Sequence, residues 1–153
     1  MSFIGNFASA ASARAIGKYN SSVIYQEAQY VRKKAEVNKK VFENIDKPRL
    51  IKKQNSEYDA LFVNLLKSGV QFRPGETAYL VGLETKINQA TDLAIAKYNA
   101  ETAREDLINR SLLLEGKAAG EMFKGKATAT AETIKGIGKM ASGQYNYGSI
   151  LAG

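Results

Sequence analysis

The sequence predicts an all-α protein: an elongated antiparallel helical hairpin with additional helices, rich in small residues, at both termini. Three observations support this fold class. The 153 residues include only 2 prolines, 44% of the residues are hydrophobic, and apolar residues recur at intervals of three and four along two long segments. A chain of this length is expected to form a single elongated helical domain over residues 1–153, since domains commonly contain roughly 100 to 200 residues.

The first long helix is predicted to begin near residue 22. Its apolar positions alternate steps of four and three, which is typical of a helix that packs lengthwise on a partner. These positions are Ile24, Ala28, Val31, Ala35, Asn38, Phe42 and Ile45. Pro48 then interrupts the pattern, because proline lacks an N–H and disfavours helical geometry in the residue before it. We expect Asp46 to cap the helix that follows.

A second helix, ending at Lys67, is predicted to lead into the hairpin turn at residues 68–76. Its apolar face consists of Tyr58, Leu61, Phe62, Leu65 and Leu66. Glycine suits the end of a helix, and a Pro-Gly pair favours a turn. The turn residues are Gly69, Val70, Phe72, Pro74 and Gly75. Val70 and Phe72 are expected either to fill the tip of the hairpin or to dock on a neighbouring subunit.

The returning helix shows the same spacing of apolar residues. Its predicted contact positions are Leu80, Leu83, Ile87, Ala90 and Ala94, and the pattern continues to Leu114. Two long helices joined by a short turn are expected to pack antiparallel. The predicted hairpin therefore covers residues 22–115, with residues 23–66 packed on residues 78–114.

Both predicted arms, residues 1–21 and 116–153, are rich in Ala, Gly, Ser and Thr. Small side chains allow helices to approach closely, and such helices need a partner because glycine weakens them in isolation. The positions expected to pack between subunits, or alternatively in a membrane, are Gly116, Gly120, Ala127, Ala131, Ile134 and Gly138.

The net charge of +7 belongs to the first half of the chain, where residues 1–75 contain 13 Lys and Arg against 6 Asp and Glu. The basic positions singled out are Arg32, Lys33, Lys34, Lys39, Lys40, Lys52 and Lys53. They fit a solvated helix face, a contact with nucleic acid or a contact with an acidic partner. Phe42 is the only aromatic residue among them, so stacking on bases is not expected. A DNA contact would be to phosphates and sensitive to salt.

The residue inventory predicts no catalytic, cofactor or metal site, so an enzyme is not expected. The chain has no Cys and no His, which removes thiol nucleophiles, imidazole general bases and nearly every zinc, haem or iron–sulfur site. The segment GEMFKGKAT, Gly120 to Thr128, approximates a phosphate-binding loop, but Ala127 stands at the position of the metal-binding hydroxyl. Glu101 and Glu105 share a helix face near Arg104 and are interpreted as a solvated surface. No run of about 18 apolar residues is present.

Residues 68–104, SGVQFRPGETAYLVGLETKINQATDLAIAKYNAETAR, resemble a pattern of internal virion proteins of short-tailed bacteriophages. The pattern is a helix, an S-G-V turn, a small-residue cluster and a helix that passes through a Y-N-x-E-like segment. The matching positions are Ser68, Gly69, Val70, Tyr98, Asn99 and Glu101. The small-residue-rich beginning and the glycine-punctuated end of the chain are also similar to that family.

The resemblance implies the smaller internal core, or ejection, protein of a podovirus. Such a protein forms a homo-oligomeric ring inside the capsid, with the portal, other core proteins and packaged DNA as partners. It leaves the virion at infection and helps to form a conduit through the host cell envelope, where it contacts membrane. The alternatives are a sequence-independent nucleic-acid-binding protein, another head–tail structural component, and a pore-forming protein that acts alone.

Overall fold

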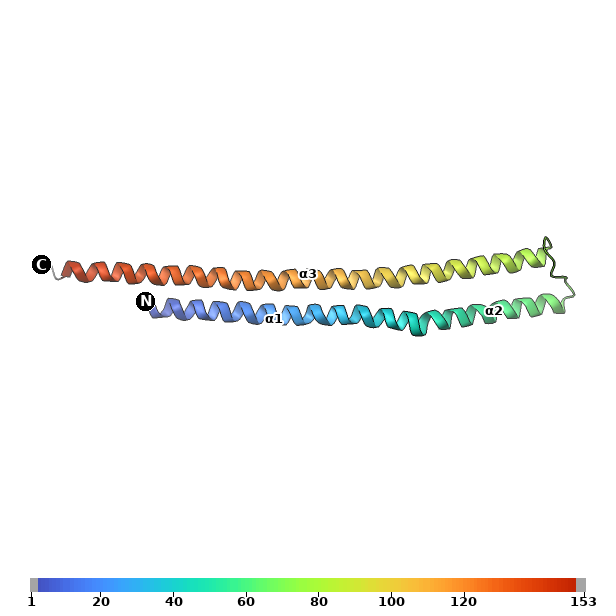
Figure 1. Ribbon diagram of the computed structural model, residues 1–153, viewed down its shortest axis with the longest axis horizontal. Coiled ribbons are helices and arrows are strands. Elements are labelled where there is room, and N and C mark those ends of the chain that lie inside the picture. Colours follow the sequence, from blue (N-terminus) through green and yellow to red (C-terminus); the bar gives the residue numbers. More distant parts are fainter. Residues whose placement is uncertain (1–2, 151–153) are drawn as a thin grey trace. The chain divides into compact units, whose positions relative to one another are not determined.

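The computed structural model describes the backbone of residues 3–150 and the side chains of residues 5–142. All regular secondary structure in the described part of the chain is helical: α1 covers Phe3–Val41, the π-helix η1 covers Phe42–Asp46, α2 covers Lys47–Lys67 and α3 covers Thr77–Ile150 (Figure 1). This confirms the predicted all-α helical hairpin. The small-residue arms are helical as predicted, and they continue α1 and α3 without a break. The predicted arms also extend beyond the described residues at both ends.

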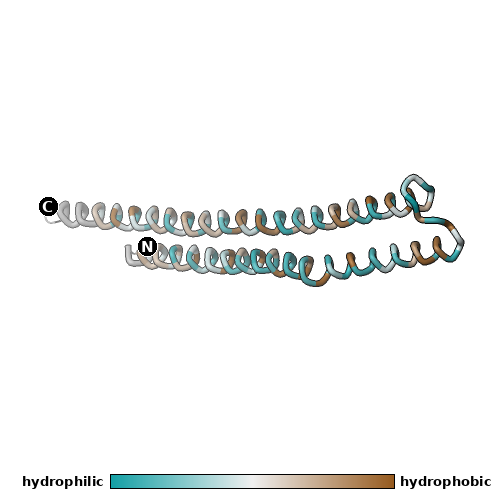
Figure 2. The backbone as a smooth tube through the Cα atoms, turned by 45° about the vertical axis from the view of Figure 1, so that its right-hand side comes forward, coloured by the Kyte–Doolittle hydropathy of each residue, from teal (hydrophilic) through white to brown (hydrophobic). Residues whose placement is uncertain are grey.

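The chain divides into two compact units, each containing a pair of antiparallel helical segments. Unit 1 joins the first 31 residues to residues 109–153, and unit 2 covers residues 32–108. Figure 2 shows that apolar residues are spread along every helix and not gathered in one segment. The packing of each unit therefore depends on which face of each helix is buried.

The turn of unit 2 begins with a glycine cap at the end of α2. Gly69 has a φ of 75°, a conformation that costs glycine little. Its N–H donates to the carbonyl of Leu66, and the N–H of Val70 donates to the carbonyl of Leu65. These are the two hydrogen bonds of a Schellman motif, which ends a helix and satisfies its last carbonyls. Gly75, with a φ of 89°, allows the second bend before α3.

Phe72 fills the tip of this turn. Its ring lies edge-on to Phe62 at 5.1 Å and to Tyr79 at 5.7 Å between ring centroids. A β-carbon built on Gly82 would lie 2.9 Å from the Phe72 ring, so the glycine makes room for it. Val70 remains exposed. Of the two apolar turn residues, only Phe72 therefore contributes to the packing of the hairpin.

The expected helix break at Pro48 is absent, and a π-helix precedes the proline instead. Asp46 makes no side-chain cap, and the N–H of Lys47 donates to the carbonyl of Phe42, five residues earlier. The predicted side-chain cap by Asp46 was wrong, although α2 does begin directly after Asp46 with Pro48 in its first turn. Because Pro48 has no N–H to donate, the wider π turn accommodates it without ending the helix.

The π-helix also sets which residues of α2 face α3. Regular steps of three and four from Phe42 would lead to Lys53, Glu57, Ala60 and Asn64. The observed buried or half-buried positions lie one residue later, at Gln54, Tyr58, Leu61 and Leu65. One additional residue in a turn rotates everything after it by about 100°. The π turn therefore places Tyr58, Leu61 and Leu65 at the contact in place of Glu57, Ala60 and Asn64, and it places Gln54 there in place of Lys53.

Several predicted contact positions were wrong. On the first helix, Ala28, Val31 and Ala35 are buried as expected, but Asn38 and Ile45 are exposed. On α3 the predicted apolar face is exposed, namely Leu80, Leu83, Ile87, Ala90 and Ala94. Mostly smaller or polar residues, together with Leu93, face α2 and the end of α1 in unit 2, namely Ala78, Gly82, Thr85, Gln89, Leu93, Ala96 and Ala100.

Small side chains line the contact between the two helical segments of unit 1. We call this contact the seam, and its buried positions are Ala10, Gly17, Ser21, Ala28, Val31, Ser111, Ala118, Gly125, Ala129 and Gly136. The helices approach each other closely at Gly17 and Gly125, where a β-carbon built on Gly17 would lie 2.8 Å from the Cα of Gly125. Such an approach leaves no room for large side chains.

Polar pairs fix the alignment of the helices in each unit. In unit 1, Asn20 donates to Glu121 at 3.3 Å. In unit 2, the Gln54 side chain donates to the carbonyl of Gln89 at 2.8 Å, and the Gln89 side chain donates to the carbonyl of Gln54 at 2.6 Å. Sliding one helix past the other would leave these amides without partners, and unpaired buried polar groups are costly.

Deleting Asn44 should destabilise unit 2 by about 2–4 kcal/mol, because the lost residue rotates Tyr58, Leu61 and Leu65 away from α3. The matched control Asn44→Ala keeps the residue count and should change the free energy of unfolding by about 0.5 kcal/mol or less. Chemical denaturation followed by circular dichroism measures both. Equal stability of the deletion variant and the parent would show that the π turn does not set the alignment.

Gly17→Ala should destabilise unit 1 by about 1–3 kcal/mol, because the new methyl group meets the Gly125 backbone and no flexible side chain can yield. This loss should appear even though alanine favours the helix. The control is Gly5→Ala, where nothing lies within 4 Å of the new β-carbon, so the melting temperature should stay or rise. A Gly17→Ala melting temperature equal to that of the control would contradict the close approach.

Candidate assembly surfaces and basic groups

In unit 1, α3 has an apolar stripe on the side opposite the seam. Its residues lie within about 100° of one another on a regular helix, and all are exposed. They are Leu112, Gly116, Gly120, Phe123, Ala127, Ala131, Ile134 and Gly138, which we call the α3 outer stripe. Phe123 and Ile134 are 74% and 64% exposed. All six residues predicted to pack between subunits belong to this stripe, and a β-carbon added to its three glycines would meet nothing within 4 Å.

The α1 segment of unit 1 has a matching stripe of larger residues, also opposite the seam. Ile16, Tyr19, Val23 and Tyr30 form this α1 outer stripe. Tyr19 and Tyr30 are 71% and 68% exposed. Steps of three, four and seven place these four side chains on one face of a helix. Each helical segment of unit 1 thus has two apolar faces, and the seam covers only one of them.

Unit 2 leaves a similar apolar face on α3. Leu80, Leu83 and Ile87 are 54%, 47% and 57% exposed. They form the spacing that the sequence analysis assigned to the contact with the second helix. The spacing correctly identified a helix with an apolar face, but the packing inside the chain uses another face of the same helix.

The seven predicted basic residues do not form one continuous patch. Lys34 points about 160° away from Arg32 on α1, since each residue turns a helix by about 100°. Lys39 pairs with Glu43 at 3.9 Å and Lys53 pairs with Glu57 at 3.7 Å. Among residues 5–142, Lys33, Lys34, Lys40 and Lys52 form no ion pair. The acidic residues between them make this a mixed surface.

Arg104 links α3 to the end of α1 in unit 2. Its guanidinium donates to Glu36 at 2.9 Å. This hydrogen bond and the charge of Arg104, with smaller help from Lys39 and Lys40, hold the pKa of the Glu36 carboxyl below its ordinary value. A lowered folded pKa adds stability above the ordinary value, and this stability is lost as the pH falls through the folded pKa. The pair is exposed to solvent, so its effect is small.

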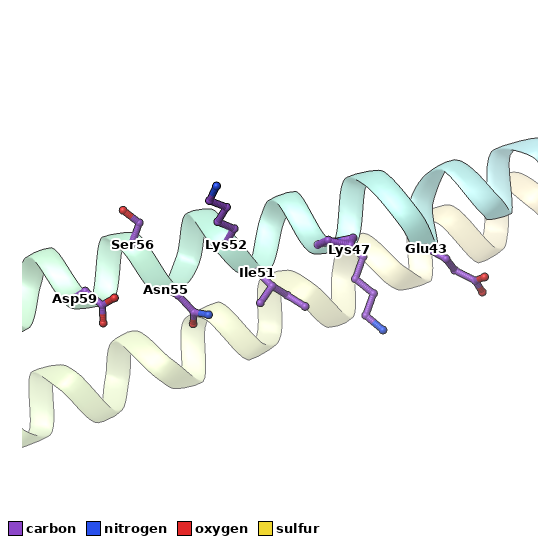
Figure 3. A pocket seen from close by; sticks show the side chains of 8 residues that line it. Glu43, Lys47, Ile51, Lys52, Asn55, Ser56 and Asp59 are labelled. Atoms are coloured by element: carbon purple, nitrogen blue, oxygen red, sulfur yellow. The ribbon is translucent and has the colours of Figure 1, made fainter.

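A groove along α2 lacks the features of a reactive site. It is lined by Glu43, Lys47, Pro48, Ile51, Lys52, Asn55, Ser56 and Asp59. Figure 3 shows that these side chains are spread along the helix and do not converge on a common point. In the part of the chain that the structure describes, no three acidic residues come together to hold a metal ion.

The segment that approximates a phosphate-binding loop, Gly120 to Thr128, lies inside α3. Its backbone N–H groups take part in a regular helix, whereas a phosphate loop must turn them toward the ligand. Glu101 pairs with Lys97 at 3.8 Å, as expected for a solvated helix surface.

The sequence analysis did not identify a basic groove in unit 1. Arg14 and Lys18 of α1 lie beside Met122, Lys126 and Thr130 of α3 around an open groove of about 400 Å³. The basic residues of the two helices are more than 100 positions apart in the sequence. These residues could have been brought together only by aligning the two ends of the chain antiparallel. That alignment places Arg14 and Lys18 opposite Lys126.

No helix in the described part of the chain has both the length and the apolar character needed to cross a lipid bilayer. Comparisons with models of protein families, with curated proteins and with solved structures find no match to this chain.

Proposed function

We propose that this chain is a structural subunit that assembles with copies of itself, and that it serves in the internal core of a short-tailed bacteriophage. One observation carries the assembly proposal: in the described part of the chain the buried apolar residues are almost all alanines, whereas most of the large apolar side chains are exposed. A protein that functions as a monomer normally buries its large apolar residues.

The exposed area supports association between copies. The chain exposes 11311 Å², whereas a folded monomer of 16.7 kDa is expected to expose roughly 7,600 Å². A stable interface requires about 800 Å² from each partner. The excess is therefore sufficient for each copy to contact more than one neighbour.

The two outer stripes of unit 1 are complementary in size. The α1 outer stripe has large side chains, and the α3 outer stripe has three glycines and two alanines that leave space between Leu112, Phe123 and Ile134. Two α3 outer stripes facing each other would bury few large groups. We therefore expect the α1 outer stripe of one copy to pack on the α3 outer stripe of the next, a heterologous contact that can close into a ring.

The positions of these residues along the helix axes of unit 1 agree with such a contact. Within the chain, Gly17 lies opposite Gly125 and Asn20 contacts Glu121. In a ring whose axis follows the helices, all copies share one direction and one height. Tyr19 and Val23 of one copy then lie level with the neighbour's α3 outer stripe near Gly120, where glycine leaves room for large side chains.

The virion setting rests on the resemblance of residues 68–104 to internal virion proteins. On this proposal the subunits form a ring beside the portal, near packaged DNA, and leave the capsid to help build a conduit through the host envelope. Protection of the protein from protease inside intact particles, and loss of that protection after ejection, tests this setting.

The main alternative is a helical protein that binds nucleic acid without sequence preference, and the second alternative is another head–tail structural component. The mixed charges around the seven basic residues give the nucleic-acid alternative less support than the exposed apolar stripes give to assembly. Within a virion core, Lys33, Lys34, Lys40 and Lys52 remain available for phosphate contacts.

Sedimentation equilibrium of the parent chain should show a concentration-dependent oligomer. Gly116→Ala combined with Gly120→Ala should weaken assembly by about tenfold or more, because two methyl groups fill the space for the neighbour's side chains. The same changes should raise the stability of the isolated chain, since alanine favours helices. The control Thr128→Ala, on another face of α3, should leave the mass unchanged.

The absence of Cys allows the direction of the contact to be tested by disulfide formation. Ile16→Cys and Ala127→Cys chains should cross-link when mixed, and each alone should form few dimers. A monomer at every concentration would contradict self-assembly. An oligomer in which Ala127→Cys chains link efficiently to each other would contradict the heterologous contact and leave self-assembly in place.

A further inference from the structure

The basic groove of unit 1 contains three cations without acidic partners. Arg14, Lys18 and Lys126 line it together with Met122 and Thr130. In the part of the chain that the structure describes, none of the three forms an ion pair. Like charges that converge from two helices repel one another, and a bound anion relieves this repulsion.

The chemistry of the three groups suits a phosphate. A guanidinium presents a planar fork of donors that can hold two phosphate oxygens, and lysine ammonium groups add point charges. The Thr130 hydroxyl donates to the carbonyl of Lys126 at 3.0 Å, and its oxygen lies at the groove wall. The groove is open to solvent along the two helices, so a large molecule could present its phosphate there.

A second, largely apolar groove adjoins the basic one and shares two of its residues. Lys18 and Met122 line both grooves. Beyond them the second groove is lined by Ser21, Ser22, Tyr25, Ala118, Ala119 and Glu115. The two grooves together thus offer a basic end and an apolar channel, which is the arrangement that an amphiphile with an anionic head needs.

We propose that these adjoining grooves bind an anionic phospholipid, with its phosphate among Arg14, Lys18 and Lys126 and an acyl chain along Tyr25, Ala118 and Ala119. Nucleic acid fits less well, because the apolar groove offers a phosphodiester chain no further cation. The site lies along the contact between the helices of unit 1, and the three cations, Arg14, Lys18 and Lys126, belong to neither outer stripe.

Binding of the full chain to vesicles tests the proposal. Vesicles with equal parts of phosphatidylcholine and phosphatidylglycerol should bind the parent, and pure phosphatidylcholine vesicles should bind it weakly. The variant Arg14→Gln/Lys18→Gln/Lys126→Gln should lose about tenfold or more in affinity, because each cation near an anionic surface contributes to binding. The control Lys33→Gln/Lys34→Gln/Lys40→Gln removes the same charge from unit 2 and should lose much less.

Titration with ligands in solution separates the possible sources of the phosphate. Short-chain phosphatidylglycerol, below the concentration at which it forms micelles, should bind the parent more tightly than inorganic phosphate does. Equal losses in the two triple variants would overturn the proposal, as would inorganic phosphate that binds as tightly as the lipid. A groove variant that loses duplex DNA but keeps vesicle binding would also overturn it. All six substituted residues are exposed, so circular dichroism should confirm that both variants fold.

Discussion

The close approach of the two helical segments in unit 1 determines how the rest of this unit is built. At Gly17 and Gly125 the backbones come so near that neither position tolerates a β-carbon without movement. Alanines and serines fill the seam on both sides of this point. Such packing gains its stability from many small contacts between well-fitted surfaces and contains no large apolar cluster. It therefore provides only a modest share of the apolar burial that a folded chain usually has.

The same constraint explains why the large apolar residues are exposed. A pair of helices can bury only one face of each, and in unit 1 that face is made of small residues. Tyr19, Tyr30 and Phe123 are left on other faces, where only another molecule can cover them. The outer stripes thus connect the packing of the chain to its proposed role as a subunit. The three cations of the basic groove belong to neither stripe, because the groove lies where the two helices meet.

The sequence allowed the fold class, the hairpin turn and the helical nature of both arms to be predicted. Glycine and proline signals placed the turn, since Gly69 needs a positive φ that few other residues adopt. The buried face of α3 was predicted wrongly, because Leu80, Leu83 and Ile87 gave the strongest apolar spacing. Periodicity identifies an apolar face but does not say whether the chain itself or a neighbour covers it.

The π-helix and the basic groove could not be predicted from the sequence, for different reasons. Pro48 was a clear signal, but it is compatible with either a break or a wider turn, and the packing of Tyr58 and Leu61 on α3 decides between them. The groove depends on an alignment between the two ends of the chain. That alignment is set by Gly17, Gly125 and the Asn20–Glu121 hydrogen bond, none of which can be paired from the sequence alone.

Hydroxyl-radical footprinting across a range of protein concentrations tests the central claim most directly, since it reports the exposure of individual side chains. The account predicts that Tyr19, Tyr30 and Phe123 react strongly in dilute solution and become protected together as the concentration rises. Tyr58, which contacts Lys86 inside unit 2, should change little. Continued reactivity of all three residues in the assembled protein would show that the outer stripes do not join the copies.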